Sequence, residues 1–364
     1  MTRTECYLAL NSVRLIGPVR VRKLLAVFGS AEAILSKPAD ALARVEGIGQ
    51  AVADSVRAWD KSWSLTAELE RMDALGLKVV DCEDKDFPEA LREIYDPPLV
   101  LYYKGDLEAA RRRGVAVVGS RHTSFYGTET AKKLAYQLAY VGLTVTSGLA
   151  KGIDTAAHQA ALAAKGRTVA VQGCSLDQIY PRENQFLAEK ITEERGLLLS
   201  EFPLGTPPDK QTFPMRNRIV SGLSQGLLVV EAGKNSGALI TARMALEQGR
   251  QVFAVPGRID QSFAKGCHQL IKDGAKLVEG VEDILSEFEF LFPDLPKETK
   301  APLAEDLSPE ELKVHEALGL DELHVDILIR KSGLPSAVVS STLLRLEMKR
   351  LVRSLPGRIF VRVT

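Results

Sequence analysis

The sequence predicts an α/β fold built around a parallel β-sheet, with one helical domain before it and another after it. The main observation is a series of short apolar runs, most of them followed by a glycine-containing loop and a helical pattern. Continuously apolar strands that alternate with helices are typical of parallel sheets covered on both faces. The runs are Val115–Val118, Leu143–Thr146, Thr168–Val171, Gly226–Val230 and Gln251–Val255.

Length and charge limit the kind of partner. The chain has 364 residues, 45% of them apolar and 26% charged, which is enough for two or three domains. Its 47 Lys and Arg balance 47 Asp and Glu, so a basic footprint for nucleic acid has to be local. One such region is residues 330–364, which hold eight Lys or Arg and one acid, Glu347.

Cysteine and hydropathy patterns predict a cytoplasmic protein. Cys6, Cys82, Cys174 and Cys267 lie far apart without a C-x-x-C pair, which argues against a disulfide framework or a zinc site. The N-terminus lacks the apolar run of a signal peptide, and no stretch approaches the roughly 18 apolar residues of a membrane span. We therefore expect no metal and no membrane partner.

Residues 1–78 predict a helical domain of the helix-hairpin-helix or SAM-like kind. The turn Val45–Gly49 (VEGIG) lies between helical patterns, and Leu15–Pro18 looks like a degenerate second copy. Glycines in such a turn let backbone amides approach a phosphate. The same hairpins serve as protein-contact modules, so the turn leaves DNA contact and protein contact both open.

Residues 79–290 predict the core, where three loops bring polar and cationic groups to the carboxyl ends of strands. Ligands bind at that edge of a parallel sheet, and free amides at a helix start favour an anion. We expect Asp154 to cap its helix. The residues expected to contact the anion are Gly119, Ser120 and Arg121 in the first loop, Lys151 in the second, and Lys234, Ser236 and Gly237 in the third.

A fourth segment, residues 213–220, places two arginines and an amide among apolar residues. Arg216 and Arg218 can grip a phosphate bidentately when their backbone is held in this way, and Asn217 lies between them. The alternative is an arginine pair that bridges acidic groups inside the domain, because buried arginine is usually paired. We interpret Glu231 as the ion-pair partner that orients these arginines.

Signatures of nucleotide cofactors and of hydrolases are missing from the sequence. It contains no G-x-x-x-x-G-K-[ST], no G-x-G-x-x-G after the first core strand and no nucleophile elbow. We therefore expect no cofactor. Phe213, Phe125 and Tyr126 lie close in sequence to the cationic loops and could stack on exposed bases, although core packing is the alternative for Phe213.

The end of the chain predicts a linker, residues 291–306, and a winged helix, residues 307–364. Ser308–Glu311 (SPEE) is a capped helix start, two more helical patterns follow, and Pro356-Gly357 would turn a hairpin. The basic helix 336–350 suits a duplex backbone. Winged helices also dock proteins, so both roles stay open.

Several motifs follow one another in the order and spacing of one family. They resemble the DNA-processing protein A (DprA, also called Smf) family over about residues 80–285, with a departure at His268, where many relatives carry asparagine. The motifs are Val115–Arg121, Ser147–Asp154, Tyr180–Asn184, Ser200–Pro203, Phe213–Arg218, Glu231–Thr241, Val255–Gly257, Gly266–Ile271 and Gly274-Ala275.

The resemblance implies an extended Rossmann-like core in a non-enzymatic protein that binds single-stranded DNA without sequence preference. It also implies a homodimer that protects incoming DNA and loads the RecA recombinase during natural transformation. By the same likeness Arg121 and Lys234 would contact DNA phosphates. Arg216, Asn217 and Arg218 would shape or extend the same pocket.

Two other functions fit parts of the sequence. A nucleoside-monophosphate phosphoribohydrolase has a similar core topology, but such enzymes carry P-G-G-x-G-T-x-x-E. The corresponding strand end here reads E-A-G-K-N-S-G-A-L-I-T and lacks that glutamate. The other possibility is a DNA-independent adaptor that docks proteins through its end domains.

Overall fold

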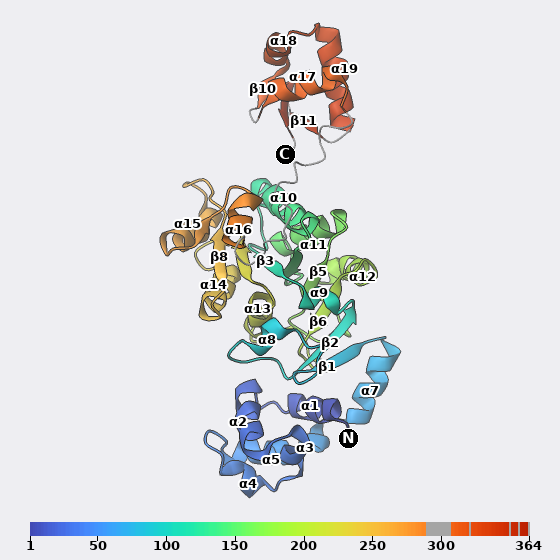
Figure 1. The fold of residues 1–364 in the computed structure, drawn as a ribbon, viewed down its shortest axis with the longest axis vertical. Helices are drawn as coiled ribbons and strands as arrows, with labels where there is room; N and C mark the ends of the chain where they lie inside the picture. Colours follow the sequence, from blue (N-terminus) through green and yellow to red (C-terminus); the bar gives the residue numbers. More distant parts are fainter. Residues whose placement is uncertain (289–306, 320–321, 349–350, 356, 363–364) are drawn as a thin grey trace. The chain divides into compact units, whose positions relative to one another are not determined.

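Figure 1 shows the fold in a computed structural model, which describes residues 1–288, 307–319, 322–348, 351–355 and 357–362. The chain divides into two compact units, Met1–Leu295 and Pro296–Thr364. The linker expected at residues 291–306 lies outside the described residues.

The larger unit begins with short helices packed around an apolar core. Tyr7 of α1, Leu24 of α2 and Ile34 of α3 are fully buried in it. Pro18 is the first residue of α2, and Gly47 adopts a φ of +84° in the turn before α5, as the hairpin pattern predicts. The helices are α1 (Arg3–Ser12), α2 (Pro18–Phe28), α3 (Ala31–Ser36), α4 (Ala39–Ala43), α5 (Gln50–Arg57), α6 (Trp59–Ser62) and α7 (Leu65–Ala74).

Nine strands form one sheet in the order β1-β2-β6-β5-β4-β3-β7-β8-β9. From β6 to β9 all neighbours are parallel, whereas β1 and β2 extend the sheet as antiparallel strands. The apolar runs identified in the sequence begin only at Val115, so these two antiparallel strands were not predicted. The strands are β1 (Lys78–Asp81), β2 (Val100–Gly105), β3 (Gly114–Val118), β4 (Thr144–Ser147), β5 (Thr168–Val171), β6 (Leu197–Ser200), β7 (Gly226–Val229), β8 (Gln251–Ala254) and β9 (Lys276–Leu277).

Helices cover both faces of this sheet. Leu134 of α10 and Ile284 of α16 share an apolar cluster with Val117 of β3, whereas Ile219 of α13 shares another with Val229 of β7. The doubly covered parallel sheet confirms the predicted Rossmann-like core. The helices are α8 (Glu89–Arg92), α9 (Glu108–Arg111), α10 (Phe125–Tyr140), α11 (Ile153–Ala163), α12 (Gln185–Glu193), α13 (Thr212–Gly222), α14 (Gly237–Glu247), α15 (Lys265–Lys272) and α16 (Val281–Phe288).

The smaller unit is a winged helix with its own apolar core, which includes Val314, Leu328 and Leu343. Ser308 Oγ accepts from the amide of Glu311, and the Glu311 carboxylate accepts from the amide of Ser308, which confirms the predicted capping box. Its elements are α17 (Pro309–Leu318), α18 (Val325–Ser332), α19 (Ser336–Met348), and a sheet of β10 (Leu323–His324), β12 (Ile359–Arg362) and β11 (Val352–Leu355).

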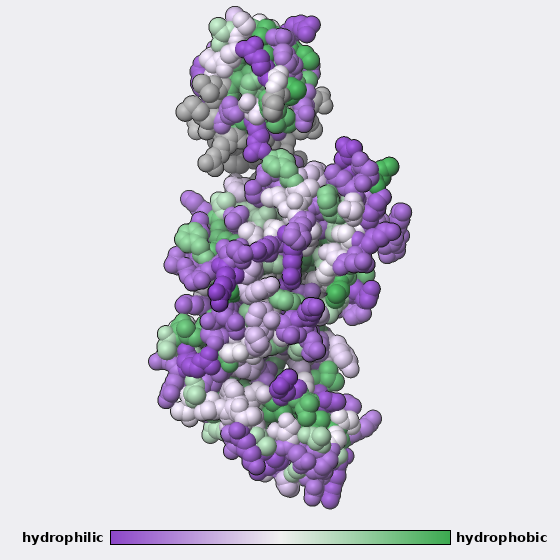
Figure 2. Space-filling model, turned by 180° about the vertical axis from the view of Figure 1, so that it is seen from behind, coloured by the Kyte–Doolittle hydropathy of each residue, from purple (hydrophilic) through white to green (hydrophobic). Residues whose placement is uncertain are grey.

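The face of the larger unit visible in Figure 2 is mainly hydrophilic, with apolar residues in scattered small groups. Single exposed apolar residues are normal on protein surfaces. Within the described ranges, no helix is both long and apolar enough to cross a membrane.

Arg218 of α13 forms a buried ion pair in the larger unit. Its Nη1 and Nη2 each donate to a carboxylate oxygen of Glu201 at 2.7 Å, and its Nε donates to Asp96 at 2.9 Å. The side chains of Arg218 and Glu201 are each 7% exposed. The pair ties α13 to the residue after β6 and to the segment before β2. Arg218 therefore bridges acidic groups inside the domain, which is the alternative that the sequence left open to a phosphate contact.

Replacement of Glu201 by Gln should destabilise the larger unit. Loss of one partner leaves a buried guanidinium only partly compensated, which typically costs about 3 kcal/mol. Glu93→Gln is the matched control, because Glu93 is 66% exposed and lies 3.9 Å from Arg250, and such surface pairs contribute less than about 1 kcal/mol. Urea denaturation measures both; equal losses in the two variants would contradict a special role for the buried pair.

Candidate nucleic-acid interface

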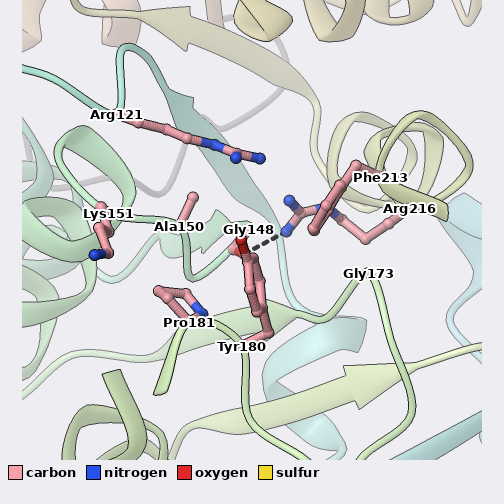
Figure 3. Close-up of a pocket in the computed structure, with 9 residues that line it drawn as sticks. All are labelled: Arg121, Gly148, Ala150, Lys151, Gly173, Tyr180, Pro181, Phe213 and Arg216. Atoms are coloured by element: carbon pink, nitrogen blue, oxygen red, sulfur yellow. Dashed lines mark hydrogen bonds between the residues drawn. The ribbon is translucent and has the colours of Figure 1, made fainter. Parts of the chain in front are cut away.

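A pocket of about 50 Å³ lies at the carboxyl ends of β3, β4 and β5 (Figure 3). Three cationic side chains reach it from separate segments: Arg121 from the loop after β3, Lys151 from the loop after β4, and Arg216 from α13. The fold thus brings together residues that the sequence holds up to 95 positions apart (216 minus 121). The other lining residues are Gly148, Ala150, Gly173, Tyr180, Pro181 and Phe213.

Arg216 is the buried cation of this pocket, with 5% of the residue exposed. Its Nη1 donates to the carbonyl of Gly148 and, at 2.5 Å, to that of Val171, so it joins α13 to the ends of β4 and β5. A Cβ at position 148 would collide with this guanidinium. The Nε atom of Arg216 is buried without a hydrogen-bond partner among the described residues.

Two ionisable groups lie close to Arg216. Asp154 Oδ2 accepts from the amides of Gly148 and Ala150 at 3.1 and 3.3 Å, so it ties down the loop after β4, in place of the helix cap expected of it. Burial raises the pKa of Asp154, and Arg216 acts against that shift. Burial, reinforced by the charge of Arg216, lowers the pKa of His158 to about 3, which keeps His158 neutral at physiological pH.

Planar groups lie along the pocket wall. The guanidinium carbon of Arg121 is 5.1 Å from the ring centroid of Phe213, within the range of a cation–π contact. The ring of Tyr180 packs against that of Phe213 in a tilted arrangement, with 5.5 Å between centroids and 41° between planes. Arg121 and Tyr180 are exposed, so the cation and the aromatic faces are accessible to a ligand.

Glu231 holds the loop that carries Arg121. Its carboxylate accepts from N and Oγ of Ser124 at 2.9 and 2.6 Å, and its backbone carbonyl accepts from the amide of Ser120 at 2.7 Å. The interpretation of Glu231 as an ion-pair partner of the α13 arginines is therefore wrong. The carboxylate lies at the N-terminus of α10, where the helix dipole and free amides favour negative charge, so the protein supplies its own anion there.

Lys151 is paired on the surface. Its Nζ donates to the carboxylate of Glu183, and both side chains are exposed, at 55% and 64%. The backbone beneath is fixed by Asn184, whose Nδ2 donates to the carbonyl of Leu149 at 2.8 Å and to Thr155 Oγ1 at 2.8 Å. Lys151 is thus an exposed cation on an anchored loop.

The third predicted loop lies outside the pocket. Lys234 is exposed after β7, Ser236 caps α14 by accepting from the amide of Ala238 at 3.3 Å, and Gly237 is the first residue of that helix. Because β3 and β7 are parallel neighbours, this loop belongs to the same edge of the sheet as the pocket.

The other residues predicted to contact the anion do not line the pocket, and three of them make contacts within the protein. Ser120 Oγ donates to a carbonyl two residues on, at 2.6 Å, and Gly119 allows close packing, since a Cβ there would lie 2.5 Å from Ile153. Arg218 is engaged in its ion pair. Asn217 is partly buried on α13 and does not line the pocket.

Tyr180, Pro181 and Gly173 line the pocket although motif reasoning did not assign them to it. They come from the loop after β5, which brings no cation into the pocket. The available signals were a glycine after an apolar run and an aromatic residue followed by proline.

These features define an α/β protein with cationic and aromatic groups gathered at the carboxyl edge of its sheet. The pocket lining includes three cations and no carboxylate, and the described residues contain no cluster of His, Cys, Asp and Glu suited to a metal ion. The chain belongs to the DNA recombination-mediator protein A family, whose model matches residues 78–289. Residues 298–358 match the DprA winged helix domain, and residues 7–58 match a SAM-like helix-hairpin-helix tandem.

Curated relatives support this assignment and confirm the resemblance seen in the motifs. Protein Smf of Escherichia coli (strain K12) is 42% identical over 77% of this chain and 76% of its own length. Protein Smf of Synechocystis is 35% identical over 98% of both chains. DNA processing protein DprA of Streptococcus pneumoniae is 49% identical over 57% of this chain and 73% of its own length.

Solved structures agree. DNA processing protein A from Streptococcus pneumoniae superposes with a TM-score of 0.70 at 39% identity, covering 80% of this chain and 99% of that one. DNA processing protein A from Helicobacter pylori, in a study of its single-stranded DNA binding mode, gives a TM-score of 0.54 at 30% identity, covering 60% of this chain and 97% of that one.

The buried His158 should make the larger unit sensitive to acid. Its folded pKa of about 3 lies below the unfolded value of about 6.5, so the unfolded state binds more protons between these limits and stability falls as pH decreases. From pH 7.5 to pH 5.5 the parent should lose about 1.4 kcal/mol more unfolding free energy than His158→Gln. Urea denaturation at both pH values measures this difference; parallel losses in the two proteins would contradict it.

Proposed function

We propose that this protein binds single-stranded DNA without sequence preference at the edge of the sheet formed by the loops after β3, β4, β5 and β7. The observation that carries the proposal is the convergence of Arg121, Lys151 and Arg216 with the rings of Phe213 and Tyr180 in one pocket. Cations beside accessible aromatic faces are the combination by which proteins bind single strands, because phosphates need neutralisation and every base offers a π-face.

Different residues take different parts in this proposal. Arg121 and Lys151 neutralise phosphates from exposed positions, and Arg216 provides a fixed buried charge. Lys234, with the amides of Gly237 and its neighbours, continues the cationic edge past the pocket. The exposed ring of Tyr180 provides a stacking face, and Phe213 packs against it and holds the guanidinium of Arg121 over its own ring.

We further propose that the chain works in the cytoplasm as a non-enzymatic homodimer that protects incoming single strands and loads the RecA recombinase during natural transformation. Membership in the DNA recombination-mediator protein A family supports this role. So does the similarity to the Helicobacter pylori protein, which binds single-stranded DNA.

Replacement of Arg121 by Gln should weaken oligonucleotide binding and reduce its salt dependence. Each lost phosphate contact lowers the slope of log K against log salt by about 0.7 on single strands. Lys272→Gln is the control, because Lys272 is exposed in the last turn of α15, which leads into the amino end of β9 at the opposite edge. Fluorescence anisotropy over a range of salt measures both variants; equal slopes in the parent and Arg121→Gln would remove Arg121 from the contact surface.

The alternative of a phosphoribohydrolase is tested directly. The pocket lining contains no carboxylate to act on a glycosidic bond, so purified protein incubated with nucleoside monophosphates should release no base. Chromatography of the reaction measures this, and release of free base above a no-protein control would favour the enzyme.

A further inference from the structure

We propose that the DNA site continues beyond the pocket as a second nucleotide position made by Lys151, Glu183 and Phe186. This inference rests on the proposed function and extends it to residues of α12. In it, a base stacks on Phe186 and the adjoining phosphate displaces Glu183 from Lys151.

Phe186 is the first observation. It is 77% exposed in the first turn of α12, whereas Leu187, Ala188 and Ile191 of the same helix are buried at 7%, 2% and 0%. These three residues already anchor the helix to the core, so Phe186 has no part in that packing. A large ring held in solvent offers an unobstructed face for stacking.

The ion pair between Lys151 and Glu183 places this ring next to the pocket. Lys151 lines the pocket and its ammonium donates to Glu183. Glu183 precedes Phe186 by three residues in a continuous 3-10 and α-helical run, Arg182–Asn184 followed by Gln185–Glu193, and residues three apart lie on the same side of such a run. Moving outward from the pocket, the groups therefore follow one another in the order Lys151, Glu183, Phe186.

The separation lies within reach of one strand bound in the pocket. Phe186 lies five residues after Pro181 of the pocket wall, and helical rises of about 2.0 and 1.5 Å per residue place it about 9 Å farther along. Stacked nucleotides are spaced about 3.4 Å apart along a strand. A strand that leaves the pocket thus reaches Phe186 within about three nucleotides.

Glu183 has a specific part in this arrangement. An exposed ion pair contributes little, because both groups remain hydrated. A phosphate carries a full negative charge and several acceptor oxygens, so it can replace the carboxylate on Lys151. Glu183 therefore competes with DNA for the same ammonium and lowers the affinity for single strands.

The first experiment uses Phe186→Trp in the full chain with an oligothymidylate of about 15 nucleotides, near the upper site size of a single-strand module. The parent already contains Trp59 and Trp63, so its fluorescence is subtracted from that of the variant. The remaining fluorescence, which comes from position 186, should be quenched on binding. Tyr140→Trp is the control, because Tyr140 is 43% exposed at the last residue of α10, at the amino edge of the sheet. Quenching in the first variant alone supports the second position; equal quenching, or none at Phe186→Trp, overturns it.

The second experiment measures affinity by anisotropy with the same oligonucleotide. Phe186→Ala should weaken binding about fivefold or more, the effect of losing one stacked base. Glu183→Gln should strengthen it roughly threefold, and this gain should vanish when Lys151 is also replaced by Gln. Glu194→Gln, which breaks a similar exposed pair with Lys190 at the far end of α12, should change nothing.

Unchanged affinity in Phe186→Ala, or a gain from Glu183→Gln that persists without Lys151, would overturn the second position. A parent protein that fails to bind the oligonucleotide would instead refute the proposed function itself, so the two failures are distinguishable.

Discussion

The buried guanidinium of Arg216 is the constraint on which the site depends. It joins the ends of β4 and β5 to α13 through two carbonyls, and it leaves room for nothing larger than glycine at position 148. A buried charge is costly unless its surroundings compensate it; burial lowers the pKa of Arg216, and the nearby Asp154 and the two carbonyls that accept from the guanidinium act against that cost. The cation is therefore ordered before any ligand arrives, which reduces the entropy lost on binding.

The carboxylate of Glu231 explains why the pocket is not a nucleotide-cofactor crevice. In open α/β sheets a cofactor binds where the strand order reverses, which here lies between β3 and β7. Glu231 fills that point with its own carboxylate, bonded to Ser124 at the start of α10, and a Cβ at position 127 would lie 2.5 Å from it. The open pocket is consequently displaced toward β4 and β5, where cationic and aromatic groups meet.

The parallel strands and their glycine loops could be predicted because continuous apolar runs allow few other interpretations. The antiparallel extension could not, since Lys78–Asp81 is partly exposed and carries charged residues at both ends. The partners of the two arginines also could not be predicted from the neighbouring sequence. Arg216 and Arg218 are two positions apart on a helix and so diverge by about 200°, and one meets the pocket while the other meets Glu201.

This divergence gives α13 two functions that depend on each other. Arg218 fixes the helix to Glu201, and Arg216 can line the pocket only if the helix stays in that position. The segment that supplies Glu201 is itself held by the N-terminal helices, since Asn11 donates to the carbonyl of Glu201 at 2.8 Å and Glu68 accepts from the amide of Leu204 at 2.9 Å. Side chains far from the pocket therefore determine where its buried cation lies, because interiors are packed too densely to absorb a displacement of one element alone.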